Sequence, residues 1–136
     1  MRTANDITRL CNKLITQSVK DRTMWPLFSA NIQKAIDKGL FFTKWDGDTL
    51  IAFMLCRLLK RTGKLSLDKI AVHKDYRNRG FGTEMINELK KYNLPIKLDV
   101  ANCNHAAIRF YERYGFNKTG EKILGKTHIS IYEYKN

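Results

Sequence analysis

The feature that most constrains this fold is a glycine loop between an extended segment and a helical one. Residues 73–82 contain Gly80 and Gly82, and they follow a segment with strand character and precede one with helical periodicity. Glycine adopts left-handed backbone dihedrals at little cost, so such a loop can turn sharply and aim its N–H groups at one point. The chain is therefore predicted to contain a strand that passes through this loop directly into a helix.

Three strands are predicted ahead of the glycine loop. Apolar residues dominate the segments 40–45, 49–59 and 64–72. The turn residues Asp46-Gly47-Asp48 join the first two segments, and Arg61-Thr62-Gly63 joins the second to the third. Turns of this kind between strands favour β-hairpins, so the three segments are predicted to form an antiparallel meander.

Two helices are predicted before the strands. Apolar residues from Ile7 to Ile15 recur at the spacing of one helix face, with Asn5 or Asp6 as the expected N-cap. A second helix is expected to start near residues 23–26 and to stop at Gly39. Its buried side is predicted to hold Phe28, Ile32, Ala35 and Ile36.

The remainder of the chain alternates between helical and extended patterns. After the glycine loop we expect a helix with Met85, Ile86 and Leu89 buried, a strand around 96–100, a helix over 105–114, and strands around 116–123 and 128–134. This order predicts an α/β (mixed α+β) fold. Its central sheet is mixed but mostly antiparallel, flanked by helices, with one βαβ-type crossover after the meander. The length of 136 residues fits one domain spanning 1–136.

The glycine loop also has the chemistry of a phosphate site. The N-terminus of the following helix adds partial positive charge, and Lys74, Arg77 and Arg79 add full charges. A Walker A loop is excluded because no lysine lies between Gly82 and Thr83. A dinucleotide fingerprint is excluded because Met85 stands where a third small residue is needed. Taken alone, the sequence of this loop has one alternative interpretation, which is an ordinary basic turn.

Two motifs in register carry a family resemblance. Residues 77–82 read Arg-Asn-Arg-Gly-Phe-Gly and satisfy the pattern Gln/Arg-x-x-Gly-x-Gly/Ala. Residues 104–111 satisfy Asn-x-x-Ala-x-x-Phe-Tyr, and Gly-Phe follows at 115–116. Over about residues 40–134 the chain resembles the GNAT superfamily of acyl-CoA-dependent N-acetyltransferases, with its GNAT-like fold. The first strand of that family, which precedes the first helix, has no clear match.

The resemblance implies acetyl-CoA (coenzyme A) as the acetyl donor. No metal is expected, because His73, His105 and His128 lack the spacing of metal ligands. The resemblance implies that the loop amides hold the pyrophosphate, that the strand edge before the loop pairs with the pantetheine arm, and that Asn104 binds the pantetheine. Asn104 is also placed to cap a helix, and both roles are compatible. The implied cofactor-binding residues are Ile70, Ala71, Val72, Arg77, Asn78, Arg79, Gly80, Phe81, Gly82, Thr83, Asn104, Ala107 and Phe110.

The resemblance also implies direct transfer of the acetyl group to a primary amine. Tyr111 matches the family tyrosine that protonates the leaving thiolate. A phenol with a pKa of about 10 can protonate a thiolate whose acid has a pKa of about 8.5. The alternative role for Tyr111 is core packing. Asp68 is the candidate general base, and strand alternation predicts that it shares a face with Ile70 and Val72. Its alternative is a surface ion pair with the adjacent Lys69.

The strong positive charge of the chain bears on which molecule accepts the acetyl group. The formal net charge is +12, and eight basic residues lie between Arg57 and Arg79 against two acidic ones. Binding of the CoA phosphates is expected to account for the basic residues nearest Arg79. We hypothesise that an anionic or nucleic-acid-linked partner, such as a tRNA, contacts Arg57, Lys60, Arg61 and Lys64. The alternatives are a solvated basic face, and a non-catalytic CoA- or nucleic-acid-binding module on the same fold.

Cysteine spacing and hydropathy bear on the compartment. Cys11, Cys56 and Cys103 are scattered, which argues against disulfides and zinc and favours buried, reduced thiols. No apolar run approaches the length of about 20 residues that spans a membrane. We expect a cytoplasmic protein with no membrane partner, either a monomer or a homodimer.

Overall fold

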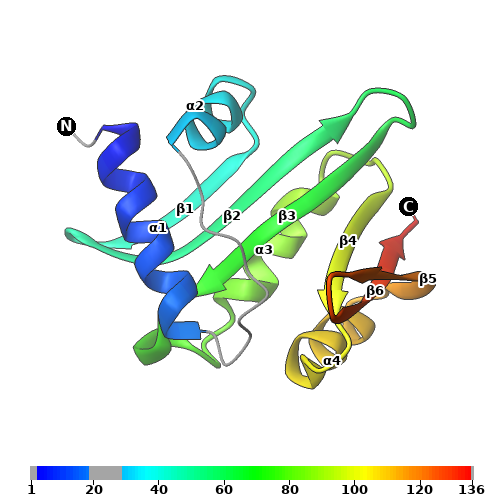
Figure 1. Cartoon of the computed structure of the whole chain (residues 1–136). Helices are drawn as coiled ribbons and strands as arrows, with labels where there is room; N and C mark the ends of the chain where they lie inside the picture. Colours follow the sequence, from blue (N-terminus) through cyan, green and yellow to red (C-terminus); the bar gives the residue numbers. More distant parts are fainter. Residues whose placement is uncertain (1–2, 19–28, 136) are drawn as a thin grey trace.

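The helices and strands follow the predicted order (Figure 1). The computed structural model describes residues 3–18 and 29–135. Within these ranges, no helix is long and apolar enough to cross a membrane. The elements are α1 (Ala4–Ser18), α2 (Ser29–Asp37), β1 (Phe41–Asp46), β2 (Thr49–Leu59), β3 (Lys64–Val72), the 3-10 helix η1 (Lys74–Tyr76), α3 (Phe81–Lys90), β4 (Ile96–Ala101), α4 (His105–Arg113), β5 (Asn117–Leu124) and β6 (Thr127–Tyr134).

Six strands form one sheet in the order β1-β2-β3-β4-β6-β5. The neighbours β3 and β4 are parallel and are connected through α3, whereas every other neighbouring pair is antiparallel. The structure therefore confirms the mixed, mostly antiparallel sheet with a single strand–helix–strand crossover.

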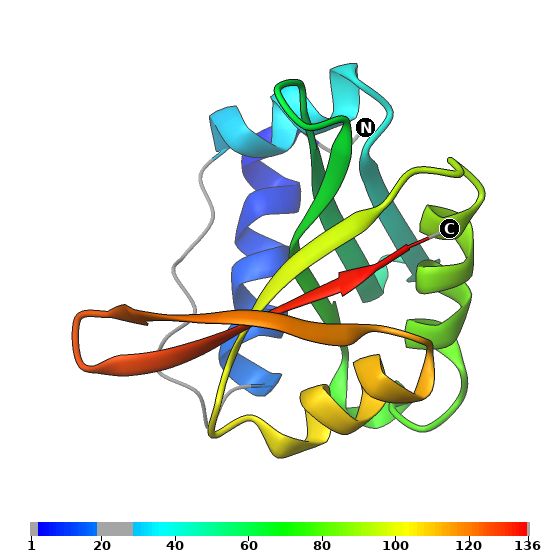
Figure 2. The same ribbon diagram turned by 90° about the vertical axis from the view of Figure 1, so that its right-hand side faces the viewer.

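Helices cover both faces of the sheet (Figures 1 and 2). Buried side chains of α1 and α2 pack against Phe53 and Leu55 on one face. Those of α3 and α4 pack against Met54 and Cys56 on the other face. Because successive residues of a strand point to opposite faces, β2 supplies both clusters and is the most buried strand of the sheet.

A β-bulge interrupts β3 at Asp68. In the pairing of β3 with β2, Leu67 lies opposite Cys56 and Lys69 lies opposite Leu55, so Asp68 is an extra residue with no partner across the ladder. A bulge of this kind bends its strand and increases the local twist. The bulge therefore marks the point at which β3 changes direction.

The strands β3 and β4 separate just beyond this point. Their pairing joins only residues 65–67 of β3 to residues 96–98 of β4. From Asp68 to Val72, the edge of β3 that faces β4 pairs with no strand of the described residues, and the two strands diverge (Figure 1). The sheet thus opens into a V whose point lies at Leu67 and Leu98.

The helix ends differ from the sequence prediction in one respect. The N-cap of α1 is Thr3, not Asn5 or Asp6. The Thr3 hydroxyl oxygen accepts from the Asp6 N–H at 3.1 Å, and the Asp6 carboxylate accepts from the Thr3 N–H at 3.1 Å. This reciprocal capping box satisfies two helix N–H groups, which explains the earlier start. In the described part of the chain, α1 is the first element.

Two predictions of burial are also corrected. Ile36 is 40% exposed although Ile32 and Ala35 are buried, so the buried side of α2 is narrower than the sequence pattern indicated. Cys103 is exposed, because it lies in the loop between β4 and α4, whereas Cys11 and Cys56 are buried as predicted. Phe28 and the predicted helix start at 23–26 lie outside the described residues.

Candidate active site

A pocket of about 830 Å³ occupies the opening between β3 and β4. Its walls come from the outer half of β3, the glycine loop, the first turn of α3, the end of β4, and α4. The pocket brings together both predicted catalytic residues and every predicted cofactor-binding residue except Arg79. These lining residues are Asp68, Ile70, Ala71, Val72, Arg77, Asn78, Gly80, Phe81, Gly82, Thr83, Asn104, Ala107, Phe110 and Tyr111.

The glycine loop presents free N–H groups to this pocket. Asn78 (φ 61°) and Gly80 (φ 87°) both adopt left-handed dihedrals, which fold the loop tightly against the start of α3. Gly80 is the N-cap of α3 and has no capping side chain, and Glu84 is the first residue to donate back, to the Gly80 carbonyl at 2.9 Å. The N–H groups of residues 81–83 therefore have no acceptor within the helix. They form a site for an anion.

Packing against Phe110 of α4 favours glycine at position 82. A Cβ at this position would lie 3.2 Å from the edge of the Phe110 ring, which is closer than ordinary van der Waals contact. The absence of a side chain lets α4 approach the first turn of α3. The two sequence motifs are therefore in contact at the pocket wall.

Contacts from the β1–β2 hairpin brace the loop. The Tyr76 hydroxyl donates to Asp46 at 2.9 Å, which raises the pKa of Tyr76, and Lys44 pairs with Glu84 of α3. The guanidinium of Arg79 lies 5.2 Å from the centroid of the Tyr76 ring. Arg79 thus stacks on an aromatic side chain and lies outside the pocket wall, which differs from its predicted position.

Tyr111 is buried at the inner wall of the pocket. Its side chain is 7% exposed, and its ring packs against Phe110 and Phe116 at centroid distances of 5.5 and 5.6 Å. Burial, with a smaller contribution from the neighbouring Cys56 thiol, raises the pKa of Tyr111 well above its usual value. Among the side chains and backbone groups that the structure describes, none makes a hydrogen bond to its hydroxyl. Tyr111 is therefore a buried, protonated phenol whose hydroxyl has no described partner.

Asn104 is the N-cap of α4. Its side-chain oxygen accepts from the Ala107 N–H at 3.3 Å. Asn104 also lines the pocket. The capping role anticipated from the sequence is confirmed, and the amide nitrogen of the same side chain stays a candidate donor to a bound ligand.

Asp68 lies on the other side of the sheet from the position predicted. Leu67, Ile70 and Val72 all pack in the core with α3, because the bulge shifts the alternation of β3 by one residue. Asp68 instead faces Arg57, whose Nε and Nη2 donate to the two carboxylate oxygens at 2.5 and 3.2 Å. Asp68 does form an ion pair, but its partner is Arg57 and not Lys69, the partner predicted from the sequence.

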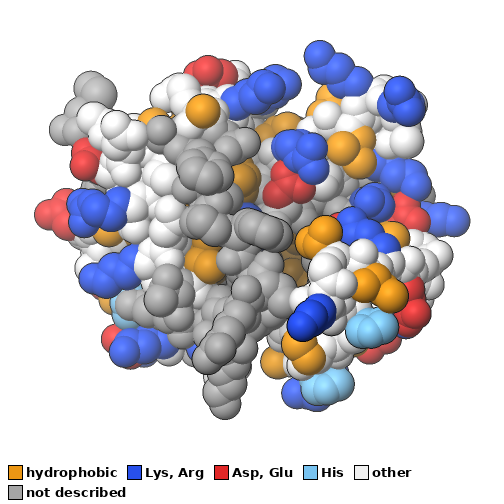
Figure 3. Space-filling model, viewed as in Figure 1, with side chains coloured by type: hydrophobic (Ala, Val, Ile, Leu, Met, Phe, Trp, Pro, Cys, Tyr) orange, Lys and Arg blue, Asp and Glu red, His pale blue; other side chains and the backbone are white. Residues whose placement is uncertain are grey.

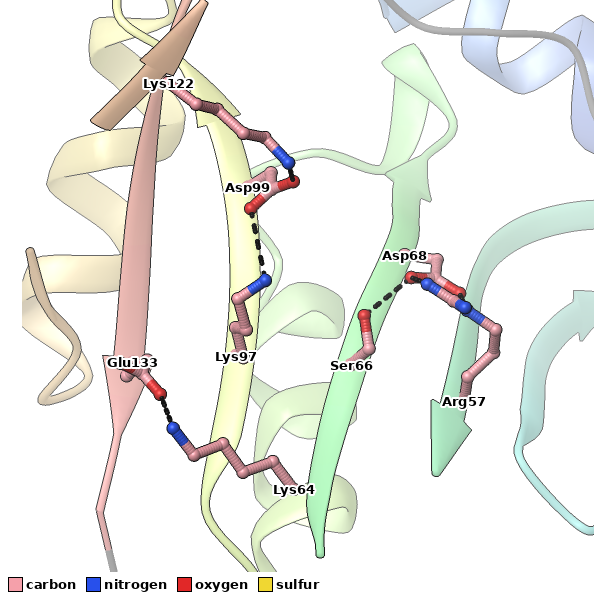
Figure 4. A network of polar contacts seen from close by, with 8 residues as sticks. All are labelled: Arg57, Lys64, Ser66, Asp68, Lys97, Asp99, Lys122 and Glu133. Carbon is pink, nitrogen blue, oxygen red and sulfur yellow. Dashed lines mark hydrogen bonds and ion pairs between the residues drawn. The ribbon is translucent and has the colours of Figure 1, made fainter. Parts of the chain in front are cut away.

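The Ser66 hydroxyl also donates to Asp68, at 2.7 Å (Figure 4). Although it faces away from α3, Asp68 lines the pocket, because it lies where the strands separate. Oδ1 accepts two of these hydrogen bonds and Oδ2 accepts one, so Oδ2 keeps a lone pair that can accept a proton directly or through water.

Three charged residues near the point of the V were not identified from the sequence. Lys97 and Asp99 of β4 lie on the same face as Asp68, and Lys122 of β5 reaches across to Asp99 at 2.5 Å (Figure 4). The only signal in the sequence was the alternation of β4, which placed Lys97 and Asp99 on the polar face. The approach of β5 depends on the strand order, which the sequence pattern did not specify.

Comparisons with known proteins agree with this geometry. The model of the acetyltransferase (GNAT) family matches residues 6–116. An uncharacterized N-acetyltransferase of Oceanobacillus iheyensis is 32% identical over 122 residues, which cover 81% of this chain and 74% of that protein.

Two solved structures share the fold. The Ard1 protein of Thermoplasma volcanium has a TM-score of 0.78 at 20% identity, covering 97% of this chain and 92% of that one. A protein of Arabidopsis thaliana, in complex with the bisubstrate analogue CoA-Ac-MVNAL, has a TM-score of 0.76 at 18% identity, covering 97% and 93%.

The chain therefore belongs to the GNAT family of acetyltransferases. It is an acyl-CoA-dependent N-acetyltransferase. This result favours the enzyme over the alternative of a non-catalytic binding module.

Proposed function

We propose that this protein transfers the acetyl group of acetyl-CoA to a primary amine within the opening between β3 and β4. The observation that carries the proposal is the unpaired edge of β3, which runs along the pocket from the Asp68 bulge to the glycine loop. An extended amide-containing chain can pair with such an edge as an additional strand would. The pantetheine arm of CoA has that shape and those amide groups.

The two ends of this edge have different chemistry. At the outer end, the N–H groups of residues 81–83, assisted by Arg77, are proposed to bind the pyrophosphate. At the inner end, the thioester would lie near Tyr111. In this arrangement Asn104 donates its side-chain amide to the pantetheine, while Ala107 and Phe110 form the apolar wall.

Tyr111 is proposed as the general acid. As the amine nitrogen forms its bond to the acetyl carbon, the carbon–sulfur bond breaks and the electron pair goes to sulfur. Tyr111 then donates its hydroxyl proton to that sulfur. Burial disfavours both the tyrosinate and the thiolate, because both carry charge in the same apolar surroundings, so the transfer stays close to balanced.

The strand edge is proposed to assist at the carbonyl oxygen. A backbone N–H of residues 70–72 that points into the opening can donate to the oxygen on which negative charge develops. One such donor contributes on the order of 3 kcal/mol to the transition state.

Asp68 is proposed to receive the proton that the amine releases, through an intervening water. Its position between the pocket and the opposite face of the sheet allows an amine to approach it from outside the CoA site. The ion pair with Arg57 holds the carboxylate in place.

Ion pairs within the fold leave fewer basic residues for a polyanionic partner to contact at the hairpin between β2 and β3. Arg57 and Lys64 hold ion pairs with Asp68 and Glu133, so their charges are matched within the fold. Lys60 and Arg61 are exposed at the tip of the hairpin. A partner that contacts this hairpin would therefore depend mainly on Lys60 and Arg61.

The proposal is tested by release of the CoA thiol from acetyl-CoA in the presence of a panel of amines, with the acetylated product identified by mass spectrometry. We expect amine-dependent thiol release and an N-acetylated product. The proposal is contradicted if acetyl-CoA binds but no amine in the panel increases thiol release above the rate of hydrolysis.

A further inference from the structure

A second, smaller recess lies on the face of the sheet opposite α3. Its volume is about 220 Å³. The residues that line it are Arg57, Leu59, Ser66, Leu67, Asp68, Lys97, Leu98, Asp99 and Lys122. Leu67, Asp68, Asp99 and Lys122 line the large pocket as well. The two cavities therefore meet at the point where β3 and β4 separate, which is where the proposed acetyl transfer takes place.

The cations of this recess exceed its carboxylates by one. Arg57 is paired with Asp68. Lys122 and Lys97 share the single carboxylate of Asp99, at 2.5 and 3.9 Å (Figure 4). Because Asp99 carries one negative charge, the pair of lysines keeps one positive charge without a partner in the recess.

The side chains around Asp99 are accessible from outside. The side chains of Lys97, Asp99 and Lys122 are 34%, 39% and 45% exposed. On the face of the molecule seen in Figure 3, basic and acidic side chains gather over the half that contains β3 and β4. A ligand can therefore reach both lysines while its amine lies toward the opening.

The proposed phosphate site at the glycine loop does not account for these charges. No residue of the glycine loop lines the recess. The loop follows the last residue of β3, Val72, whereas the recess lies beside Ser66 and Asp68 in the first half of that strand. The proposed phosphate site and the recess are thus at opposite ends of the strand.

We propose that the acceptor is a small amine that also carries a carboxylate, as an amino acid does. Its amine lies at the opening beside Asp68, and its carboxylate binds between Lys97 and Lys122. This inference rests on the proposed function and specifies its substrate class. A polyamine would bring further positive charge to a recess that already holds one unmatched positive charge, and a neutral amine would leave that charge unmatched.

The experiment compares matched acceptors at saturating acetyl-CoA. Each of a set of amino acids is assayed beside its carboxamide and its decarboxylated amine, and kcat/KM is expressed per unprotonated amine. We expect the amino acid to be preferred by about tenfold or more over both analogues, since it alone forms charge-assisted hydrogen bonds with the lysines.

Two lysine variants test whether the preference for the amino acid arises in the recess. Lys97→Gln and Lys122→Gln are expected to lower the ratio of kcat/KM for the amino acid to kcat/KM for its carboxamide about tenfold. Lys126→Gln is the matched control, because this exposed lysine lies in the turn after β5 and does not line the recess. It is expected to leave both substrates unchanged.

The outcomes separate the two proposals. Equal kcat/KM for amino acid and carboxamide, in wild type and variants alike, would overturn the substrate class while leaving N-acetyl transfer intact. A preference that survives both lysine substitutions would overturn the assignment of the recess. Absence of transfer to every amine would overturn the proposed function and this inference with it.

Discussion

At the scale of single residues, Asn78 and Gly80 show how the loop is held in shape. Both have left-handed dihedrals, with φ values of 61° and 87°. Asparagine tolerates this region, whereas most other residues with a Cβ do so at a cost of about 1–2 kcal/mol. The two positions therefore respond differently to substitution.

We expect Gly80→Ala to lower the free energy of unfolding by about 1 kcal/mol, because alanine is strained at this φ. It should also weaken acetyl-CoA binding, because the strain moves the N–H groups of residues 81–83. Chemical denaturation and calorimetric titration measure the two effects. Asn78→Gly, which relieves strain in the same loop, is the matched control. Unchanged stability and affinity in Gly80→Ala would contradict the assigned role of the loop.

The three cysteines are predicted to differ in reactivity. Burial raises the pKa values of Cys11 and Cys56 to about 12, whereas Cys103 is exposed. Since the thiolate is the reactive form, only Cys103 should be alkylated rapidly by iodoacetamide at pH 8 in the native protein. Mass spectrometry counts the modified thiols. Rapid labelling that persists in Cys103→Ser would show that a buried cysteine is accessible.

The same buried thiols predict how stability depends on pH. Their pKa values of about 12 in the folded chain exceed the value of about 8.5 for an unfolded cysteine. Their contribution is fully present below about pH 8.5, and it is lost as the pH rises toward 12. Urea unfolding at pH 7 and pH 10 should show a decrease. The decrease should be smaller in Cys56→Ala, and an equal decrease would contradict this cause.

At the scale of elements, the bulge in β3 has the largest consequence for the site. The extra residue, Asp68, ends the pairing with β4 after residue 67, and the free edge that follows is the proposed site for pantetheine. The same bulge turns Asp68 away from Ile70 and Val72. One inserted residue thus creates the opening and places a carboxylate on its far side.

The helix α1 gives an independent test of local structure. Thr3→Ala removes the hydroxyl that accepts from the Asp6 N–H, and the free energy of unfolding should fall by about 1 kcal/mol. Acetyl-CoA affinity should not change, because Thr3 does not line the pocket. The exposed helical residue Asn5 provides the control Asn5→Ala. A loss of affinity in Thr3→Ala would show that α1 influences the CoA site.

Sequence patterns predicted most elements because the signals are local. The ends of β2 and β3 follow from turn residues and from alternating apolar side chains, and the two motifs fall at the glycine loop and α4 as expected. The bulge was missed because a single extra residue in a strand leaves its composition unchanged. The Lys122–Asp99 pair was missed because it joins β5 to β4, and strand order is set by packing of the whole sheet.

At the scale of the whole molecule, the net charge is +12, and the basic residues behind it have different roles. Arg57 and Lys64 are matched by acidic partners within the fold. The proposed CoA site accounts for Arg77, and the recess beside Asp99 accounts for Lys97 and Lys122. Part of the excess charge therefore has proposed ligands, one at the glycine loop and one in the recess.

Salt should affect the donor substrate through this charge. The KM for acetyl-CoA is expected to rise between 50 and 200 mM NaCl, because screening weakens attraction between a positive protein and the phosphates of CoA. Dephospho-CoA thioesters carry less negative charge and should show a smaller rise. An equal response of the two donors would show that the effect does not come from the phosphate charge.

The central claim is that acetyl transfer depends on the buried hydroxyl of Tyr111. The most direct test measures kcat and acetyl-CoA affinity in Tyr111→Phe beside Tyr92→Phe, whose hydroxyl donates to the Gly39 carbonyl away from the pocket. We predict that kcat falls about a hundredfold or more in Tyr111→Phe, with affinity retained, and that Tyr92→Phe resembles the wild type. An unchanged kcat in Tyr111→Phe would contradict the claim.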